Sequence, residues 1–278
     1  MIKNIYYDIM TMLKICNYRT FLYKINSKPK KMGNKIVILG TSPEASNYFE
    51  HRENFLEYDL MTVNNFPLDE ERFMEYKPRY HCMVHPGLFG EGAFLLDAEE
   101  KRKRLKKFWD IMQKVDWPLY IVTYGGNHLP INNANIKLIW ITPISYNNES
   151  TCFQKWCFNN NLCVSLSHNV TTVGIQFAEI FGYSEIALFG ITLNRMKDFV
   201  VNDKNQLLIK EKHFYGAGES VIANDTYLRQ LKAEYYTFWG FEECNNLALE
   251  KNIKIVNYSP NSFLQCFEKR KIDNTIKI

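Results

Sequence analysis

Small and polar residues follow three apolar segments in the first third of the chain. Residues 36–39, 59–63 and 81–84 are each rich in apolar side chains, and each ends in residues able to contact a ligand. These are Gly40, Thr41 and Ser42, then Asn64 and Asn65, then His85, Pro86 and Gly87. A corner from strand to helix leaves backbone N–H groups free for a phosphate, and an Asn side chain can read a base edge or a ribose. Ordinary tight turns use the same residue types, but the three segments together favour a nucleotide site.

Further along the chain, hydroxyl and imidazole groups supply candidates for anion binding and proton transfer. Thr171 and Thr172 begin a predicted helix, whose free N–H groups suit an anion, although simple capping of that helix is the alternative. His213 is the first candidate for a general base, because histidine titrates near neutral pH. Residues 216–218 read Gly-Ala-Gly and predict a loop able to close over a substrate. In the alternative interpretation, His213 only orders this loop.

The other histidines contribute two further candidates for the reaction. His85, at a predicted strand end, is the second candidate base, and it could instead pair with a donor phosphate. His128, in the glycine-containing segment 124–128, is the third candidate, although this segment is more simply an exposed loop. No role is predicted for His51, His81 or His168.

The sequence predicts neither a metal nor a resident cofactor. No Asp-x-Asp sequence occurs, so the ligands of a metal–diphosphate clamp are not apparent. The 7 cysteines include no Cys-x-x-Cys pair, which argues against a zinc site and suits reduced thiols in the cytoplasm.

The elements that must position these residues alternate between strand and helix from residue 35 onward. We expect strands at 36–39, 59–63, 81–84, 119–123, 136–142, 185–189 and 253–256. Helices are expected at 44–56, 97–115, 171–181 and 232–251. This pattern predicts an α/β fold with a Rossmann-like, mostly parallel sheet and helices on both faces. In such sheets, ligands bind beyond the carboxyl ends of the strands.

Residues 1–34 differ from the rest and predict a basic amphipathic arm. Residues 1–31 carry seven Lys or Arg residues against a single acid, Asp8, and Ile2, Ile5, Ile9 and Leu13 recur at helical spacing. One interpretation is a helix that lies on an anionic membrane surface. The other is a helix packed against the main domain or against a second subunit.

Size and charge restrict the classes of function. The chain has 278 residues, a formal net charge of +4 and 46% hydrophobic residues, enough for a substantial core. The basic residues gather in the arm instead of along a groove, which disfavours nucleic-acid binding. No apolar run is long enough to span a membrane, and no signal peptide is apparent, so we expect a cytoplasmic protein, peripheral at the membrane if the arm binds it.

Several short segments, in a preserved order across residues 36–267, resemble the bacterial lipooligosaccharide sialyltransferases. The resemblance lies in Ile38-Leu39-Gly40-Thr41-Ser42-Pro43, Val63-Asn64-Asn65-Phe66, His85-Pro86-Gly87-Leu88-Phe89, Thr171-Thr172 with Gly174, Gly182-Tyr183-Ser184-Glu185-Ile186, Phe189-Gly190-Ile191, His213-Phe214-Tyr215-Gly216 and Ser259-Pro260-Asn261-Ser262-Phe263-Leu264. The resemblance implies a Rossmann-like, metal-independent glycosyltransferase that uses CMP-activated sialic acid.

It also implies the residues that contact the donor. These are Gly40, Thr41, Ser42, Asn64, Asn65, Thr171, Thr172, Gly190, Asn194, Tyr215 and Ser262.

The chain departs from the family pattern where the family contacts the sugar and the acceptor. The family has a catalytic His where Ala217 stands here, and a phosphate-binding Tyr where Asn194 stands. Thr192 replaces an Asp, Asn169 replaces an Arg, and His85 replaces an Asn. The resemblance therefore supports a CMP-dependent transferase more strongly than it supports sialic acid as the transferred group.

We expect a transferase domain over residues 35–270, with a lid at about 193–230, preceded by the arm and followed by a tail at 271–278. It would transfer sialic acid, or a similar acidic sugar, to a glycan acceptor in surface-polysaccharide or lipooligosaccharide synthesis. The acceptor is either a free glycan or a glycan linked to a lipid. The alternatives are transfer of another CMP-activated group, such as a phosphonate or phosphoalcohol, and a non-catalytic nucleotide-binding subunit. The sequence leaves the linkage and the oligomeric state open, a homo-oligomer included.

Overall fold

The computed structural model describes residues 2–22, 31–89, 99–144, 151–166, 168–213, 216–221 and 225–272. The chain forms two compact units. The first contains residues 1–31 and 61–166, and the second contains residues 32–60 and 167–278. Both contribute strands to one mostly parallel sheet.

The central sheet has eight strands and confirms the predicted α/β, Rossmann-like class. Its strands lie in the order β13, β12, β8, β1, β2, β3, β4, β5. Their bounds are β1 Lys35–Leu39, β2 Asp59–Val63, β3 Tyr80–Cys82, β4 Leu119–Tyr124, β5 Ile136–Ile141, β8 Glu185–Phe189, β12 Lys254–Asn257 and β13 Glu268–Lys269. In the second unit β1, β12 and β13 join β8 or one another in parallel pairs, and in the first unit β2, β3, β4 and β5 do the same.

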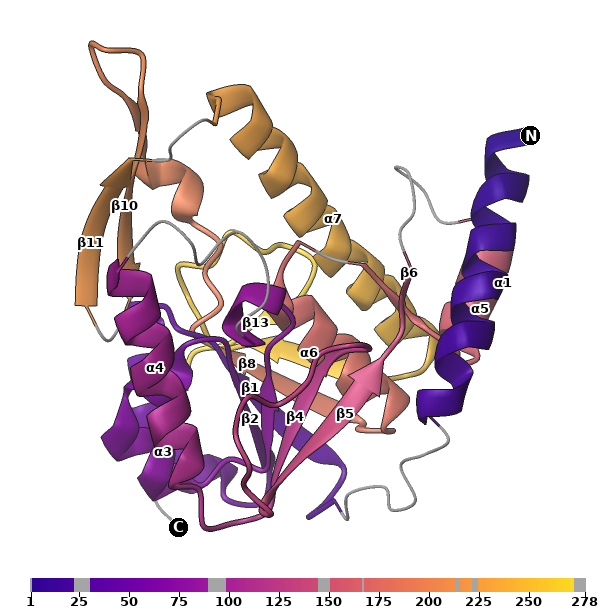
Figure 1. Ribbon diagram of the computed structural model, residues 1–278, viewed down its shortest axis with the longest axis horizontal. Coiled ribbons are helices and arrows are strands. Elements are labelled where there is room, and N and C mark those ends of the chain that lie inside the picture. Colours follow the sequence, from indigo (N-terminus) through magenta and orange to yellow (C-terminus); the bar gives the residue numbers. More distant parts are fainter. Residues whose placement is uncertain are drawn as a thin grey trace. The chain divides into compact units, whose positions relative to one another are not determined.

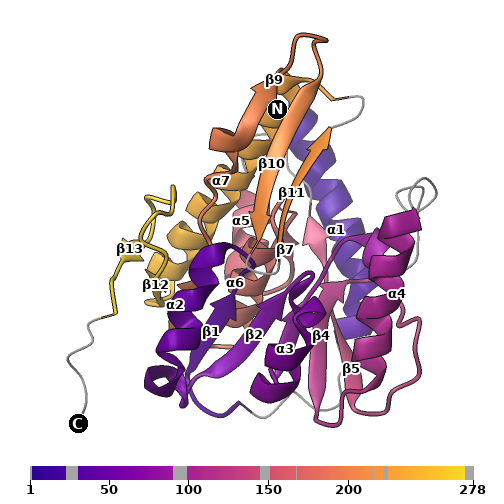
Figure 2. The same cartoon turned by 90° about the vertical axis from the view of Figure 1, so that its left-hand side faces the viewer.

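Helices lie on both faces of these strands. In the first unit, α3 (Glu70–Tyr76) and α4 (Glu99–Gln113) lie on one face, and α1 (Ile2–Leu22) and α5 (Cys152–Asn159) lie on the other (Figures 1 and 2). In the second unit, α6 (Val170–Ile180) packs against β1 and against α7 (Tyr227–Glu250), and the short α2 (Ser46–Glu50) follows β1. The strands between these layers are buried, as the apolar runs of a parallel sheet predict.

The sequence located the strands of the central sheet well but missed shorter elements. Strands β2 and β8 have the predicted bounds. Strands β1, β4 and β5 differ from prediction by one residue at one end, and β3 and β12 differ by one or two residues at both ends. Helices α3 and α5, strand β13 and the small parallel pair β6 (Pro143–Ile144) and β7 (Val164–Ser165) were not predicted. Residues 44–56 are not one helix, because the 3₁₀ turns Pro43–Ala45 and Arg52–Phe55 flank a single short α2.

The segment predicted as a lid forms a second sheet of three antiparallel strands. These are β9 (Phe199–Val201), β10 (Leu207–His213) and β11 (Gly216–Val221). The prediction of a loop at residues 216–218 was wrong, because Gly216, Ala217 and Gly218 pair with His213, Lys212 and Glu211 across the hairpin. Glycines are tolerated on an edge strand, so a Gly-Ala-Gly composition does not by itself distinguish a loop from a hairpin strand.

After residues 260–262 the chain turns and reaches β13 without a helix. On α7, Tyr235 is exposed, and the buried positions are Glu234, Thr237, Gly240, Phe241, Cys244 and Ala248.

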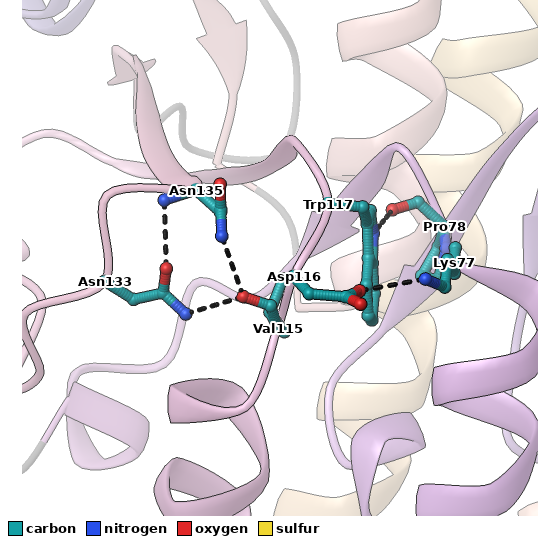
Figure 3. A network of polar contacts seen from close by, with 7 residues as sticks. All are labelled: Lys77, Pro78, Val115, Asp116, Trp117, Asn133 and Asn135. Carbon is teal, nitrogen blue, oxygen red and sulfur yellow. Dashed lines mark hydrogen bonds and ion pairs between the residues drawn. The ribbon is translucent and has the colours of Figure 1, made fainter.

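A polar network holds together the amino ends of the strands in the first unit (Figure 3). The Trp117 indole N–H donates to the Pro78 carbonyl at 2.8 Å, and Lys77 pairs with Asp116 at 2.9 Å. The side-chain amides of Asn133 and Asn135 both donate to the Val115 carbonyl at 3.0 Å. This network joins the loops before β3, β4 and β5, on the opposite edge from the predicted ligand-binding residues of that unit.

The amino-terminal helix packs on its own unit, as the second interpretation of the arm predicted. Helix α1 contacts β5 and α5. The Gln154 side chain donates to Thr11 Oγ1 at 3.0 Å, and the Thr151 hydroxyl donates to the Asp8 carboxylate. No helix in the described parts of the chain combines the length and apolar character needed to cross a membrane.

Candidate functional site

The order of the strands places a topological switch point between β1 and β8. From β1 the chain adds β2, β3, β4 and β5 on one side, and it then returns to place β8 and β12 on the other side of β1. In open α/β sheets, ligands bind outside the carboxyl ends of the strands at this point. The predicted residues Gly40, Thr41 and Ser42 follow β1, and Gly190 follows β8, so this pair of strands carries the candidate site.

The two corners after β1 and β8 lie in direct contact. The Gly40 N–H donates to the Phe189 carbonyl at 2.7 Å, and the Ser42 N–H donates to the Gly190 carbonyl at 3.3 Å. A Cβ atom on Gly40 would lie 2.4 Å from the Gly190 carbonyl oxygen, and Gly190 has φ +65°. Both glycines are therefore required by the close approach of two backbones. The Gly40 and Ser42 N–H groups already donate within the protein, so they are committed to the corner.

Two polar atoms at this corner are buried without a hydrogen-bond partner among the described residues. They are the hydroxyl oxygen of Ser42 and the Oε2 atom of Glu44. The other carboxylate oxygen of Glu44 accepts from the Asn261 side chain at 2.6 Å. Buried polar atoms in native proteins nearly always have partners, so these two atoms mark the corner as a candidate ligand site.

The segment after β8 is held by side chains from the end of β12. Asn257 donates to the Ile191 carbonyl at 3.3 Å, and Ser259 Oγ accepts from the Ile191 N–H at 3.0 Å. Thr192 donates to the Asn194 side chain at 3.2 Å. Sequence reasoning assigned no role to Asn257 or Ser259, although both are polar residues at the carboxyl end of a buried strand.

Ser262 lies in the turn that follows, buried and bonded within the protein. Its hydroxyl accepts from the Leu264 N–H at 3.2 Å. The role in nucleotide binding assigned to Ser262 stays a prediction, as do those of Gly190 and Asn194.

Helix α6 brings its first turn to the same edge of the sheet. The helix leads into β8 through a tight turn at Gly182, so helix and strand run in opposite directions and the start of α6 lies at the edge where β8 ends. Asn169 caps the helix by accepting from the Thr171 N–H at 2.8 Å, and the Thr172 hydroxyl donates to the Asn169 carbonyl at 2.6 Å. Thr171 and Thr172 are buried. Neither threonine is the capping residue, and their contacts serve the helix start.

In the first unit, the predicted residues Asn64, Asn65 and His85 follow the parallel strands β2 and β3. Asn64 adopts a left-handed backbone, with φ 49°, and its N–H donates to the Cys82 carbonyl at 3.0 Å. His85 is exposed, and its Nδ1 accepts from the Gly87 N–H at 3.0 Å. Gly40 belongs to the second unit. That these residues share one cleft with Gly40 stays a prediction.

A buried histidine next to these residues was given no role from the sequence. His81 is fully buried in β3, its Nδ1 lies 2.8 Å from Thr62 Oγ1, and its ring packs between Phe73 and Phe108. Burial lowers the pKa of His81 to about 3, so the ring is neutral at physiological pH. The Asn64 backbone lies near the ring and opposes this lowering of the pKa in part. The Nε2 atom of His81 has no hydrogen-bond partner among the described residues. A histidine inside an otherwise apolar strand was the available signal.

The candidate base His213 ends β10, at the turn of the hairpin, where its backbone pairs with Gly216. The arrowhead of β10 is directed toward the edge of the sheet at which β1 ends (Figure 2). Tyr215, predicted to contact the donor, lies outside the described residues.

One pocket of the second unit lies close to the end of β12. It has a volume of about 160 Å³ and is lined by Asn47, His51, Tyr258, Pro260, Lys271 and Ile272. None of the predicted site residues lines it.

Within the described ranges, no group of three or more His, Cys, Asp or Glu side chains is arranged to hold a metal ion.

Comparisons with protein-family models, with curated proteins and with solved structures found no match to this chain.

Proposed function

We propose that this protein is a cytoplasmic transferase that moves an acidic sugar, sialic acid or a similar one, from CMP to a glycan acceptor of a surface polysaccharide or lipooligosaccharide. The observation that supports this proposal best is the corner between β1 and β8. It combines a topological switch point, the predicted nucleotide loop and two buried polar atoms, Ser42 Oγ and Glu44 Oε2, that have no partner among the described residues.

The chemistry needs only groups that the chain contains. The donor's glycosidic bond to the CMP phosphate breaks, and a new bond forms to an acceptor hydroxyl, whose proton passes to a base. CMP leaves with a single phosphate, whose charge hydroxyls and amides can stabilise without a metal. We assign the base to His213, with His85 as the second candidate.

A second candidate function differs only in the group transferred. The chain departs from the family pattern at Asn169, Thr192, Asn194 and Ala217. In the family, the residues at these positions contact the sugar, the phosphate or the acceptor. This favours keeping transfer of another CMP-activated group, such as a phosphonate or phosphoalcohol, as the alternative.

The first prediction concerns nucleotide binding at the corner. CMP should raise the melting temperature of the protein more than UMP, CDP, UDP or GDP at the same concentration, because a ligand that binds only the folded state stabilises it. Ser42→Ala should weaken CMP binding about fivefold to tenfold in a calorimetric titration, the effect of losing one hydrogen bond.

Ser184→Ala is the matched control for Ser42→Ala. Ser184 lies at the amino end of β8, where its hydroxyl donates to the Asn34 carbonyl, so CMP affinity should stay at the wild-type value. Equal melting shifts with all five nucleotides, or an unchanged affinity in Ser42→Ala, would overturn this assignment of the site.

The second prediction concerns the base. His213→Ala should lower turnover by about a hundredfold or more, the usual contribution of general base catalysis, while CMP affinity stays near that of the wild type. Turnover is measured as CMP released from CMP-sialic acid with a glycan acceptor, and mass spectrometry of the acceptor identifies the transferred group.

His51→Ala serves as the control, since no role is assigned to His51. Unchanged turnover in His213→Ala would exclude this residue as the base. CMP binding without CMP release from any CMP-activated donor would show a binding subunit instead of an enzyme.

A further inference from the structure

Helix α1 leaves a broad apolar surface uncovered. Six of its large apolar side chains are between 37% and 58% exposed. They are Ile5, Tyr6, Ile9, Met10, Met12 and Leu13. Folded proteins seldom expose so many neighbouring apolar side chains unless the surface binds something.

The opposite side of the same helix is occupied. Thr11 is buried and accepts from the Gln154 side chain, and Asp8 accepts from the Thr151 hydroxyl. Two polar contacts to α5 therefore fix which side of α1 faces its own unit. They hold the only acidic side chain of the arm against α5, on the protein side of the helix.

The charge of the chain is divided sharply between the arm and the rest. Residues 1–31 carry seven basic residues and one acid, a net charge of +6, whereas the remaining residues carry 27 basic and 29 acidic residues, a net charge of −2. The excess positive charge of the protein thus lies entirely in the segment that also exposes the apolar side chains.

We propose that this surface of α1, formed by Ile5, Tyr6, Ile9, Met10, Met12 and Leu13, docks the protein on an anionic lipid bilayer. An amphipathic helix of this kind lies in the plane of the interface, with its apolar side among the headgroups and upper acyl chains. Anionic lipids attract the Lys and Arg residues of the arm, and the exposed apolar side chains leave water.

Charge argues for lipid over a second copy of the chain as the occupant. A symmetric dimer through α1 would bring two arms of net charge +6 together, and like charges oppose that contact. An anionic bilayer instead neutralises the positive charge of the arm and takes up its apolar side chains. Docking through α1 does not depend on which group the protein transfers.

The test is cosedimentation of the full-length protein with vesicles of phosphatidylcholine mixed with phosphatidylglycerol, compared with pure phosphatidylcholine vesicles. The wild type should bind the anionic vesicles, bind neutral vesicles much more weakly, and release from the anionic ones as salt rises. The triple variant Ile5→Gln, Ile9→Gln, Leu13→Gln should bind about tenfold more weakly or worse, because three apolar side chains no longer enter the interface.

A control replaces three apolar residues elsewhere that are even more exposed: Leu56→Gln, Leu228→Gln and Leu249→Gln. This variant should bind like the wild type. Circular dichroism of both variants checks that they fold, and each substitution is at an exposed position. Point substitutions are preferred to removal of residues 1–31, since α1 covers part of β5 and α5.

Three results would overturn the proposal. They are a wild type that stays in solution with anionic vesicles, a triple variant that binds as tightly as its control, and a wild-type dimer in analytical ultracentrifugation that the triple variant converts to a monomer. The last result would assign the surface to a second copy of the chain.

Discussion

At the scale of single residues, the second unit carries a buried carboxyl that makes stability depend on pH. Glu179 of α6 is 4% exposed, and its Oε1 has no hydrogen-bond partner among the described residues. Burial raises the pKa of Glu179 to about 8, and the charge of Lys251 opposes this shift only in part. Burial raises the pKa of the Cys244 thiol of α7, and the charge of the neighbouring Glu179 raises it further.

We predict that the free energy of unfolding falls as pH rises from about 4.5 to about 8. In this window the folded state keeps a proton on Glu179 that the unfolded state has released. Raising the pH therefore favours the unfolded state, and the free energy of unfolding decreases. Each unit of pKa difference corresponds to about 1.4 kcal/mol. Glu179→Gln should remove this part of the pH dependence, as measured by urea unfolding at several pH values.

Glu242→Gln, at an exposed position on α7, is the control and should leave the pH dependence of stability unchanged. If Glu179→Gln retained the full slope of the wild type between pH 5 and pH 8, Glu179 would not be the group responsible.

At the scale of elements, the network of Figure 3 shows how loops at the amino ends of the strands are fixed. The Asn133 side-chain amide donates to the carbonyls of Met112, Gln113 and Val115, at 3.2, 3.1 and 3.0 Å. These carbonyls stand at the end of α4 and just after it, where a helix leaves carbonyls without partners. Asn133 therefore acts as a cap supplied by the loop between β4 and β5.

We predict that Asn133→Ala lowers the free energy of unfolding by about 1–2 kcal/mol, since several carbonyls lose their donor. Asn132→Ala, one position earlier and exposed, should change stability by less than about 0.5 kcal/mol. Both are measured by urea unfolding. Equal losses in the two variants would mean that Asn133 does not cap α4.

At the scale of the whole molecule, patterns that depend on neighbouring residues were predicted well. Residues 36–39, 59–63 and 185–189 are rich in apolar side chains, which is typical of buried parallel strands, and all three are strands of the central sheet. The ion pair from Glu99 to Lys103 on α4 also follows from spacing alone, and its atoms lie 2.7 Å apart.

Features that depend on distant partners escaped prediction. Strand β11 contains two glycines and a glutamate, and only its pairing with β10 makes it a strand. Helix α5 is held by its contact with α1, which depends on a distant partner, although its capping box of Thr151 and Gln154 is a local signal that the sequence contains. The burial of His81 depends on Phe73 and Phe108, which come from helices on either side of it in the sequence.

The sequence by itself determined that this protein is an α/β protein with a helix in its basic amino-terminal segment, because strand runs, helix periodicity and charge are local properties of the chain. Only the tertiary structure decided that β8 returns beside β1 to form a switch point, that Gly40 and Gly190 meet backbone to backbone, and that α1 turns Asp8 inward and its apolar side outward. The physical reason is that each of these features is a contact between segments far apart in the chain. Such contacts are selected by the packing of the whole fold, which no local pattern records.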